Sequence, residues 1–305
     1  MIKVITPTVE VWHQENYTLD AIWKHIARCT RVCYQSVKRF PEDDDYDFLV
    51  RTIFRSHNVV KYGIPKEEQI KCHLSVCEHG TIHFKFPIFL DRAAAVFNCV
   101  YRGNKYTRWR IVNDYAYVTT NMRVFIENNR MEDLEFIDTT PNCPYYYARP
   151  TISFITDIGV SRELNRHRCH SVSEESTRYC AYDKAKFGND ITVAKVPWIT
   201  DDEYKERLPD QDKLLCDWDA IDWYIHALST CNVAYKKLRE LGWTAQQARQ
   251  VLPLSTKTQV VHTADIFDWQ HWIALRADDV SGKAHPCIKK VALQVKDLIG
   301  LHSCG

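Results

Sequence analysis

Apolar residues recur along the second half of the chain at intervals of three and four, which is the spacing of an amphipathic helix. The longest such run extends from Ile221 to Leu241, and Gly242 follows it, as is typical of a helix C-terminus. Residues 244–247 have the spacing of a capping box, which predicts another helix that Pro253 ends. We expect further helices over 265–276, with Asp265 as the N-cap, and over 286–299. The apolar face of the last helix consists of Ile288, Val291, Ala292, Val295 and Leu298.

Short apolar or alternating runs predict strands at residues 2–6, 81–90, 149–158 and 256–262. The first half of the chain also has a helical pattern over 19–36, with Thr18 in the N-cap position. A short helix is expected over 121–127, where Thr120 could be the cap, and one or two helical turns over 160–165. Helices and strands thus alternate without an internal repeat or a low-complexity tract.

The composition is that of an ordinary globular protein, because 45% of the 305 residues are hydrophobic and 26% are charged. A net charge of +1 argues against a general nucleic-acid-binding protein, which would carry a strong basic excess. No apolar run is long enough to cross a bilayer, and residues 1–17 lack the pattern of a signal peptide. We therefore expect a cytoplasmic protein without a membrane partner, whose twelve cysteines are free thiols.

The common glycine-rich phosphate-binding loops are missing from the sequence. None of its nine glycines belongs to a Gly-x-Gly-x-x-Gly or Walker-type motif. If the protein binds nucleotides, arginine side chains and helix N-termini must hold their phosphates. The sequence also predicts no metal site, because the spacing of the candidate ligands fits no common zinc pattern. Those candidates are His167, Cys169, His170 and Cys180.

Residues 166–179 form the most polar stretch of the chain. They include three arginines, two histidines, three serines and two adjacent glutamates, and Val172 is the one plainly apolar residue. In an extended chain Arg166 and Arg168 would share a face and point toward one anion, whereas on a helix they would lie about 200° apart. By composition alone, a solvated loop with surface ion pairs explains the stretch equally well.

The spacing of this stretch resembles the signature of the flavin-dependent thymidylate synthases. Eight of the nine fixed positions match, and Ser173 is the departure, because the family usually has Asn there. The matching residues are Arg166, His167, Arg168, Ser171, Glu174, Ser176, Arg178 and Tyr179. Two further segments match in the right order. They are His73, Ser75, Glu78 and His79 upstream, and Ala248, Arg249, Leu252, Pro253, Leu275, Arg276, Ala277 and Asp278 downstream.

The resemblance implies a role for each matching position. The flavin would be held by Ser75, Arg166, His167, Arg168 and Glu174, together with Asp265 and His271, where the family has asparagines. The nucleotide would be held by Glu163 (usually Gln in the family), Glu174, Glu175, Ser176, Thr177, Arg178, Arg249 and Arg276. In the family Arg249 binds the substrate phosphate, and Arg276 lies over the uracil ring. The catalytic positions would be Arg276 and Ser176.

The implied activity is the reductive methylation of dUMP to dTMP. The family uses FAD as cofactor, with NADPH and 5,10-methylenetetrahydrofolate as co-substrates. No enzyme nucleophile is implied, and a serine at position 176 would need an adjacent base to attack, which the sequence does not identify. Instead, Arg276 would stabilise negative charge on the ring. The departures at Ser173, Glu163, Asp265 and His271 leave open a homologue that binds flavin and nucleotide but has lost turnover.

The resemblance also implies an architecture. We expect an α+β fold of this family, with helices packed on a mostly antiparallel sheet in a single domain over 1–305. Residues 87–145 form an insertion relative to compact members of the family, and it could be a lid, an oligomer contact or an extension of the sheet. By resemblance, the protein would be a homotetramer with its sites between subunits.

Overall fold

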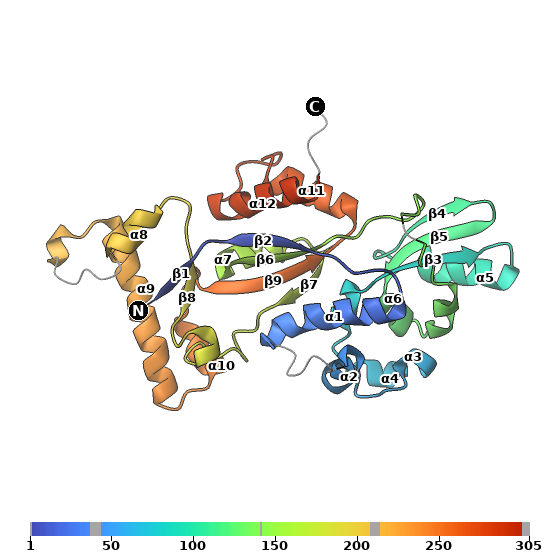
Figure 1. Cartoon of the computed structure of the whole chain (residues 1–305), viewed down its shortest axis with the longest axis horizontal. Helices are drawn as coiled ribbons and strands as arrows, with labels where there is room; N and C mark the ends of the chain where they lie inside the picture. The colour runs from blue at the N-terminus through green and yellow to red at the C-terminus, as the bar shows by residue number, and fades with distance from the viewer. Residues whose placement is uncertain (1, 37–43, 141, 208–213, 301–305) are drawn as a thin grey trace.

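The computed structural model describes residues 2–36, 44–140, 142–207 and 214–300. A four-stranded antiparallel sheet lies at its centre, in the order β2 (Thr8–Trp12), β6 (Thr151–Asp157), β9 (Lys257–Thr263) and β7 (Ser171–Glu174). Helices α11 (Ile266–Arg276) and α12 (Pro286–Leu298) lie over one side of this sheet, and α1 (Leu19–Tyr34) lies below the other (Figure 1).

The alternation of side chains along β9 explains how one sheet supports helices on both faces. Val260 is buried with Trp269 and Trp272 of α11, whereas its neighbour Val261 is buried with Cys29 of α1. Successive side chains of a strand point to opposite faces, so β9 contributes buried side chains to the helices on both faces of the sheet. The polar residues of β9 are divided between the two faces in the same way.

The helices begin where their capping residues predict. The side chain of Thr18 accepts a hydrogen bond from the Ala21 amide, and Asp265 accepts from Phe267 and Asp268. Thr244 and Gln247 form the predicted capping box of α10 (Ala245–Ala248). In α12, four of the five expected core residues are buried, but Leu298 is 51% exposed. The prediction was wrong there because Leu298 is the last residue of α12, where its side chain lines an open pocket beside β2.

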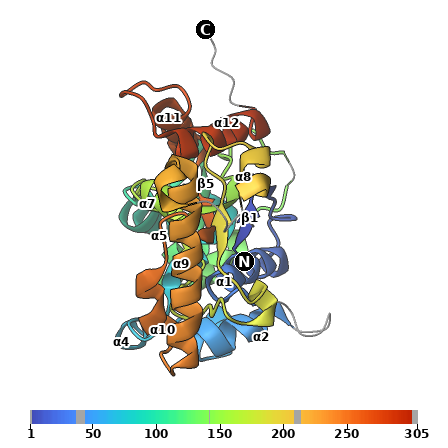
Figure 2. The ribbon, with the colours of Figure 1, turned by 90° about the vertical axis from the view of Figure 1, so that its left-hand side faces the viewer.

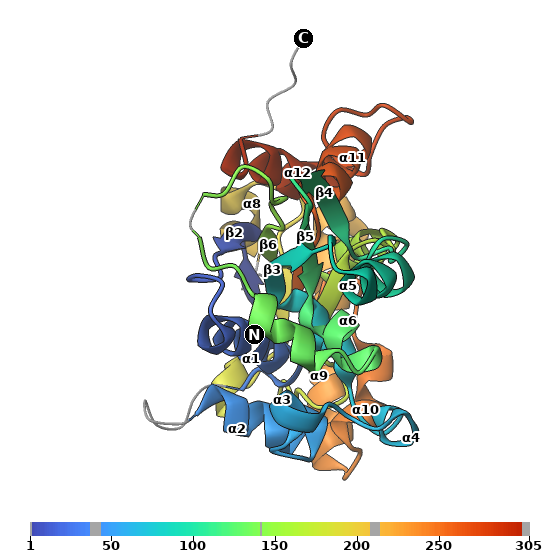
Figure 3. The ribbon, with the colours of Figure 1, turned by 90° about the vertical axis from the view of Figure 1, so that its right-hand side faces the viewer.

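The inserted region builds a second sheet. Its strands β5 (Tyr115–Asn121) and β4 (Arg108–Val112) extend from β3 (Thr81–Pro87) in the antiparallel order β3-β5-β4. The insertion thus extends β3 into a three-stranded sheet that is separate from the central one. The insertion also carries α5 (Asp91–Val96), a π-helix (Phe97–Tyr101), α6 (Met122–Glu127) and a 3-10 helix (Met131–Phe136), grouped at one end of the molecule (Figure 3).

The second sheet shares a hydrophobic core with helix α1. Phe84 and Phe125 are fully buried in the same cluster as Ile22 and Ile26 of α1. One local prediction was wrong: α6 is capped by Asn121, whose side chain accepts from the Val124 amide at 3.2 Å. The Thr120 hydroxyl instead bonds to that of Thr107 at 2.9 Å, because Thr120 is still part of β5.

The remaining elements surround these two sheets. The expected first strand is present as β1 (Lys3–Ile5), which pairs in parallel with β8 (Thr192–Ala194), and β2 follows it as a further strand that was not predicted from the sequence. The long α9 (Ala220–Glu240) runs across one end of the molecule, with α8 (Asp201–Arg207) beside it (Figure 2). Shorter segments are α2 (Asp45–Leu49), a π-helix (Val50–Phe54), α3 (Val59–Tyr62), α4 (Lys66–Gln69), α7 (Ile158–Leu164), and 3-10 helices at Leu74–His79, Ala185–Phe187, Leu215–Asp217 and Arg249–Val251.

The α+β prediction is confirmed, because helices pack on sheets whose strand pairs are antiparallel except for β1 and β8. Across the described ranges, no helix has both the length and the apolar character needed to cross a membrane. The eleven cysteines that the structure describes are free thiols, as expected, and Cys304 lies outside the described residues.

Candidate active site

The polar stretch 166–179 joins helix α7 to strand β7 and continues beyond it. The residues after α7 form a turn, so Arg166 and Arg168 lie neither in an extended strand nor in a helix, the two conformations considered from the sequence. Both side chains are exposed, and among the described residues no side chain or carbonyl accepts a hydrogen bond from them. Their guanidinium groups therefore remain available to an anion.

Strand β7 separates the two adjacent glutamates. Glu174 pairs in register with Val260, on the α11 side, and accepts hydrogen bonds from Asn165 at 2.9 Å and from Thr258 at 3.2 Å. Both of its carboxylate oxygens thus have partners from the protein. Because these partners are neutral, the charge of Glu174 is not neutralised by them.

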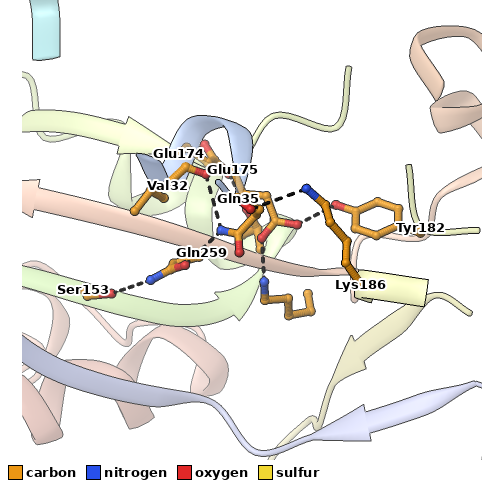
Figure 4. Close-up of polar contacts among 10 residues, drawn as sticks. Val32, Gln35, Ser153, Glu174, Glu175, Tyr182, Lys186 and Gln259 are labelled. Carbon is orange, nitrogen blue, oxygen red and sulfur yellow. Dashed lines mark hydrogen bonds and ion pairs between the residues drawn. The ribbon is translucent and has the colours of Figure 1, made fainter. Parts of the chain in front are cut away.

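Glu175 has a different environment from its neighbour. It is 3% exposed, and its carboxylate forms an ion pair with Lys257 at 2.5 Å and accepts a hydrogen bond from the Tyr182 hydroxyl at 3.1 Å. Burial, followed by the charge of Glu175, raises the pKa of Tyr182, so its hydroxyl stays protonated and donates. Beside this group, Gln35 donates to Gln259, which donates to Ser153, and Lys186 donates to the Gln35 carbonyl (Figure 4).

A pocket of about 510 Å³ opens beside these residues. Four consecutive residues of the stretch line it, and they face two arginines from other segments, Arg162 of α7 and Arg249. The four are Glu174, Glu175, Ser176 and Thr177. Arg249 donates to the Thr177 hydroxyl at 3.4 Å. This volume is in the usual range for small-molecule sites, and two guanidinium groups provide the charge to bind a phosphate.

A second pocket, of about 500 Å³, shares Arg249 with the first. Arg178 also lines it, and its Nε donates to Gln246 at 2.9 Å. Arg249 is thus placed between the two pockets, where its charge reaches a ligand in either one.

The Ser176 hydroxyl accepts a hydrogen bond from the Arg178 amide at 3.3 Å. In the part of the chain that the structure describes, no histidine or carboxylate side chain bonds to that hydroxyl. The arrangement therefore offers no base to activate Ser176 as a nucleophile.

Arg276 ends helix α11 and lies against α7. Its Nη1 is 3.1 Å from the Glu163 carboxylate, and its Nε donates to Nε2 of His167 at 3.4 Å. The side chains of Arg276 and Glu163 are 18% and 28% exposed. Burial, and then the positive charge of Arg276, lowers the pKa of His167 to about 4, so the imidazole is neutral and can accept this hydrogen bond.

Two expected flavin contacts at α11 have different surroundings. Asp265 is buried, caps the helix and pairs with Arg108 of β4, whose Nε is 2.7 Å from its Oδ2. His271, one and a half turns later, is exposed. Ser75 is also exposed, on the 3-10 helix Leu74–His79.

The residue that departs from the signature, Ser173, lies on the α1 side of the sheet. Its hydroxyl is 3.0 Å from Nε2 of His79, which is fully buried and bonded through Nδ1 to Thr263 at 2.8 Å. Burial lowers the pKa of His79 to about 3, so the ring is neutral. Ser173 therefore joins the upstream motif segment to the central sheet.

Three residues of the site were missed from the sequence. Arg162 lines the pocket, Lys257 neutralises Glu175, and Asn165 holds Glu174. Lys257 begins a strand with several polar residues, so the sequence alone does not single it out. Arg162 and Asn165 flank Glu163 and the start of the motif, but their partners depend on tertiary contacts. Within the described ranges, no group of three or more metal-binding side chains occurs.

Comparison with known proteins agrees with the motif. The family model of the thymidylate synthase complementing protein matches residues 145–300, just over half of the chain. Flavin-dependent thymidylate synthases of Thermosipho melanesiensis and Thermosipho africanus are 31% and 30% identical to it over 135 residues, which are 44% of this chain and 57% of each relative. A probable flavin-dependent thymidylate synthase of Paramecium bursaria Chlorella virus 1 is 26% identical over 142 residues, 44% of this chain and 60% of the relative. The matches thus span little more than half of these relatives.

Two solved structures of the UMP/dUMP methylase PolB from Streptomyces cacaoi are also similar. The one bound with 5-Br dUMP has 25% identity and a TM-score of 0.37, covering 50% of this chain and 66% of that one. The one bound with 5-Br UMP has 16% identity and a TM-score of 0.42, covering 98% and 92%. Both TM-scores are low, so the fold class rests on the sheets and helices described above. The match of the family model and the motif residues that lie inside it establish that the chain belongs to the thymidylate synthase complementing protein family.

Proposed function

We propose that the protein catalyses the reductive methylation of dUMP to dTMP, with FAD as cofactor and NADPH and 5,10-methylenetetrahydrofolate as co-substrates. The observation that carries the proposal is the pocket of about 510 Å³, because it brings residues of the signature together with Arg249 from a segment some seventy residues away. Relatives over this region are named flavin-dependent thymidylate synthases, which supports the same activity.

In this proposal the nucleotide phosphate binds between Arg162 and Arg249. A dianionic phosphate needs cationic donors, and guanidinium groups can bind it with two parallel hydrogen bonds each. Ser176 and Thr177 would donate from the side of the signature, and Arg178 would approach from the adjoining pocket. Glu175 would act by fixing Lys257 and the end of β7, since its own oxygens are already bonded.

The exposed turn after α7 has the donors that a flavin dinucleotide requires. Arg166 and Arg168 are exposed and have charge to offset a diphosphate, and His167 lies between them beside Arg276. Ser75, Glu174 and His271 would contribute polar contacts, and Asp265 would contribute through the first turn of α11. A bound reduced flavin would supply the hydride that completes the methyl group.

Arg276 would act on the uracil ring. Its guanidinium group stabilises negative charge, which makes carbon 5 of the ring nucleophilic without attack by the enzyme. Ser176 would position the nucleotide and not attack it, since no base bonds to its hydroxyl among the residues described. The carboxylate of Glu163 moderates the charge of Arg276 before the substrate binds.

We also propose a homotetramer with sites between subunits. The exposure of Arg166, Arg168 and Ser75 supports this, because ligand groups from a neighbouring subunit can then complete the site. Sedimentation equilibrium would give the mass of a tetramer, and a monomer with full activity would contradict shared sites.

The activity is tested with purified protein. We expect a yellow protein that releases tritium from carbon-5-labelled dUMP when NADPH and 5,10-methylenetetrahydrofolate are present. Arg249→Ala should abolish release at low dUMP, whereas Arg239→Ala, which breaks an ion pair with Asp183 elsewhere, should not. A yellow protein that binds dUMP but releases no tritium would instead indicate a homologue that has lost turnover. A colourless protein that binds neither ligand would refute both.

A further inference from the structure

The insertion contacts the proposed flavin site through one side chain. Arg108 is the first residue of β4, at the edge of the inserted sheet. Its Nε is 2.7 Å from Oδ2 of Asp265, and its Nη2 is 3.8 Å from Oδ2 of Asp268. The side chain is 37% exposed, whereas those of the two aspartates are 8% and 22% exposed. A cation of the insertion thus lies beside the carboxylates of Asp265 and Asp268, in addition to Arg149, whose charge also interacts with both.

These carboxylates create an electrostatic problem for an anionic ligand. Oδ1 of Asp265 already accepts from the amides of Phe267 and Asp268, so the helix cap is complete without Arg108. Burial and the charge of Asp265 raise the pKa of Asp268, which indicates that the two acids repel each other. Without a cation, the first turn of α11 would be unfavourable for a diphosphate.

The same turn of α11 packs against the motif. The ring of His170 lies 4.5 Å from that of Trp269, and the thiol of Cys169 interacts electrostatically with Asp268. Arg166 and Arg168 belong to the same exposed turn as Cys169. The insertion, the start of α11 and the arginine-bearing turn are therefore adjacent, and Arg108 joins the first two.

We propose that Arg108 is a positioning residue of the flavin dinucleotide site, supplied by the insertion to neutralise Asp265 and Asp268. The inference rests on the proposed function, which places the flavin at this end of α11. The family usually has a neutral asparagine where this chain has Asp265. The carboxylate and Arg108 together give a locally neutral helix start, and the arginines of the turn can then bind the diphosphate.

A purely structural role for Arg108 makes different predictions. As a brace between the insertion and α11, Arg108 would affect every ligand of the site equally, whatever the ligand's charge. As a charge-neutralising residue, it affects ligands with phosphates and not riboflavin, which has none. The neutral variant Asp265→Asn also separates the two roles, because Asn caps a helix as well as Asp does.

The experiment measures the dissociation constants of FAD and riboflavin by flavin fluorescence in the full-length protein. We expect Arg108→Gln to weaken FAD binding roughly tenfold and to change riboflavin binding less than about twofold. The double variant Arg108→Gln/Asp265→Asn should recover most of the FAD affinity. Arg110→Gln is the matched control, because Arg110 lies on the same strand and donates to the Pro144 carbonyl, and it should bind FAD normally.

Each other outcome is decisive. Equal losses of affinity for FAD and riboflavin, without recovery in the double variant, would overturn the inference and indicate a purely structural role for Arg108. Unchanged FAD binding in Arg108→Gln would overturn it too. Should that variant fail to fold, Arg108→Lys preserves the charge and must bind FAD within about threefold of the unmodified protein. Failure of the unmodified protein to bind FAD would instead refute the proposed function itself.

Discussion

The ion pair between Glu163 and Arg276 gives the sharpest test of the proposed chemistry. Glu163 stands where the family usually has a glutamine, and its carboxylate is 3.1 Å from Nη1 of Arg276. If Arg276 stabilises negative charge on the uracil ring, then Glu163 competes with the ring for the same cation. Glu163→Gln should therefore increase the affinity for dUMP, since Gln keeps a similar shape but removes the competing charge.

The magnitude follows from the geometry. Unit charges about 4 Å apart attract each other by about 4 kcal/mol at an effective dielectric constant of roughly 20. Both side chains keep some solvent contact, at 18% and 28% exposure, so we discount this to a net effect of about 1–2 kcal/mol. Since 1.4 kcal/mol corresponds to a factor of ten, the dissociation constant of dUMP should fall roughly tenfold.

The assay is isothermal titration of FAD-loaded protein with dUMP, together with the thermal unfolding midpoint. Glu127→Gln is the control, because Glu127 pairs with Arg123 at 2.7 Å on α6 of the insertion and outside the pocket. That variant should bind dUMP unchanged. Uridine nucleosides without phosphate should show the same gain in Glu163→Gln, since the effect concerns the ring.

Weaker binding in Glu163→Gln, with an unchanged unfolding midpoint, would refute this reasoning. It would show that the carboxylate attracts the substrate, as an acceptor for the ring N–H, more than it restrains Arg276. Unchanged binding in the variant would mean that Arg276 does not contact the ring.

The other predictions concern charge in the site and in the core. Lys257→Met should lower the free energy of unfolding by about 3 kcal/mol in urea titrations, because Glu175 is left buried without a cation. The double variant Lys257→Met/Glu175→Gln should recover at least half of the lost stability. Arg276→Ala should reduce turnover more than about a hundredfold with little change in melting temperature, and a large loss of stability with unchanged specific activity would contradict its role. Arg249→Ala should weaken the binding of dUMP but not that of deoxyuridine, which has no phosphate. Equal losses of affinity for the two ligands would exclude a phosphate contact. Stability should fall as the pH drops from 6.5 toward 4, because the unfolded state binds more protons than the folded state in this pH range. Each buried imidazole whose pKa is lowered contributes up to about 1.4 kcal/mol per pH unit. Urea titrations at several pH values check this for His25, His79, His83, His170 and His262.

Local signals in the sequence were sufficient for the helices and most strands. Caps such as Thr18 and Asp265 act within a few residues, so their hydrogen bonds could be predicted without the fold. The motif positions were likewise found by spacing, and five of the expected nucleotide-binding residues meet at the pocket. They are Glu174, Glu175, Ser176, Thr177 and Arg249.

Partners from distant segments could not be predicted in the same way. Glu174 is the last residue of β7 and Glu175 follows it, so the surroundings of the two side chains depend on how β7 pairs in the sheet. Lys257, 82 residues further along, becomes the partner of Glu175 only when β9 pairs with β7. The turn at Arg166 and Arg168 is neither of the two conformations considered from the sequence, because the chain must turn there to enter an antiparallel strand.

Two of the four departures from the family pattern, those at positions 163 and 265, share a physical feature. Glu163 and Asp265 each place a carboxylate where the family has a neutral amide, and each is ion-paired to an arginine, Arg276 and Arg108 respectively. A site for anionic ligands tolerates an added negative charge only when a cation offsets it. One of those cations comes from the insertion, so the proposal for Arg108 couples the insertion to the carboxylate of Asp265. The two would then have to be exchanged together, and removing the inserted sheet from this chain should require Asp265→Asn to preserve flavin binding.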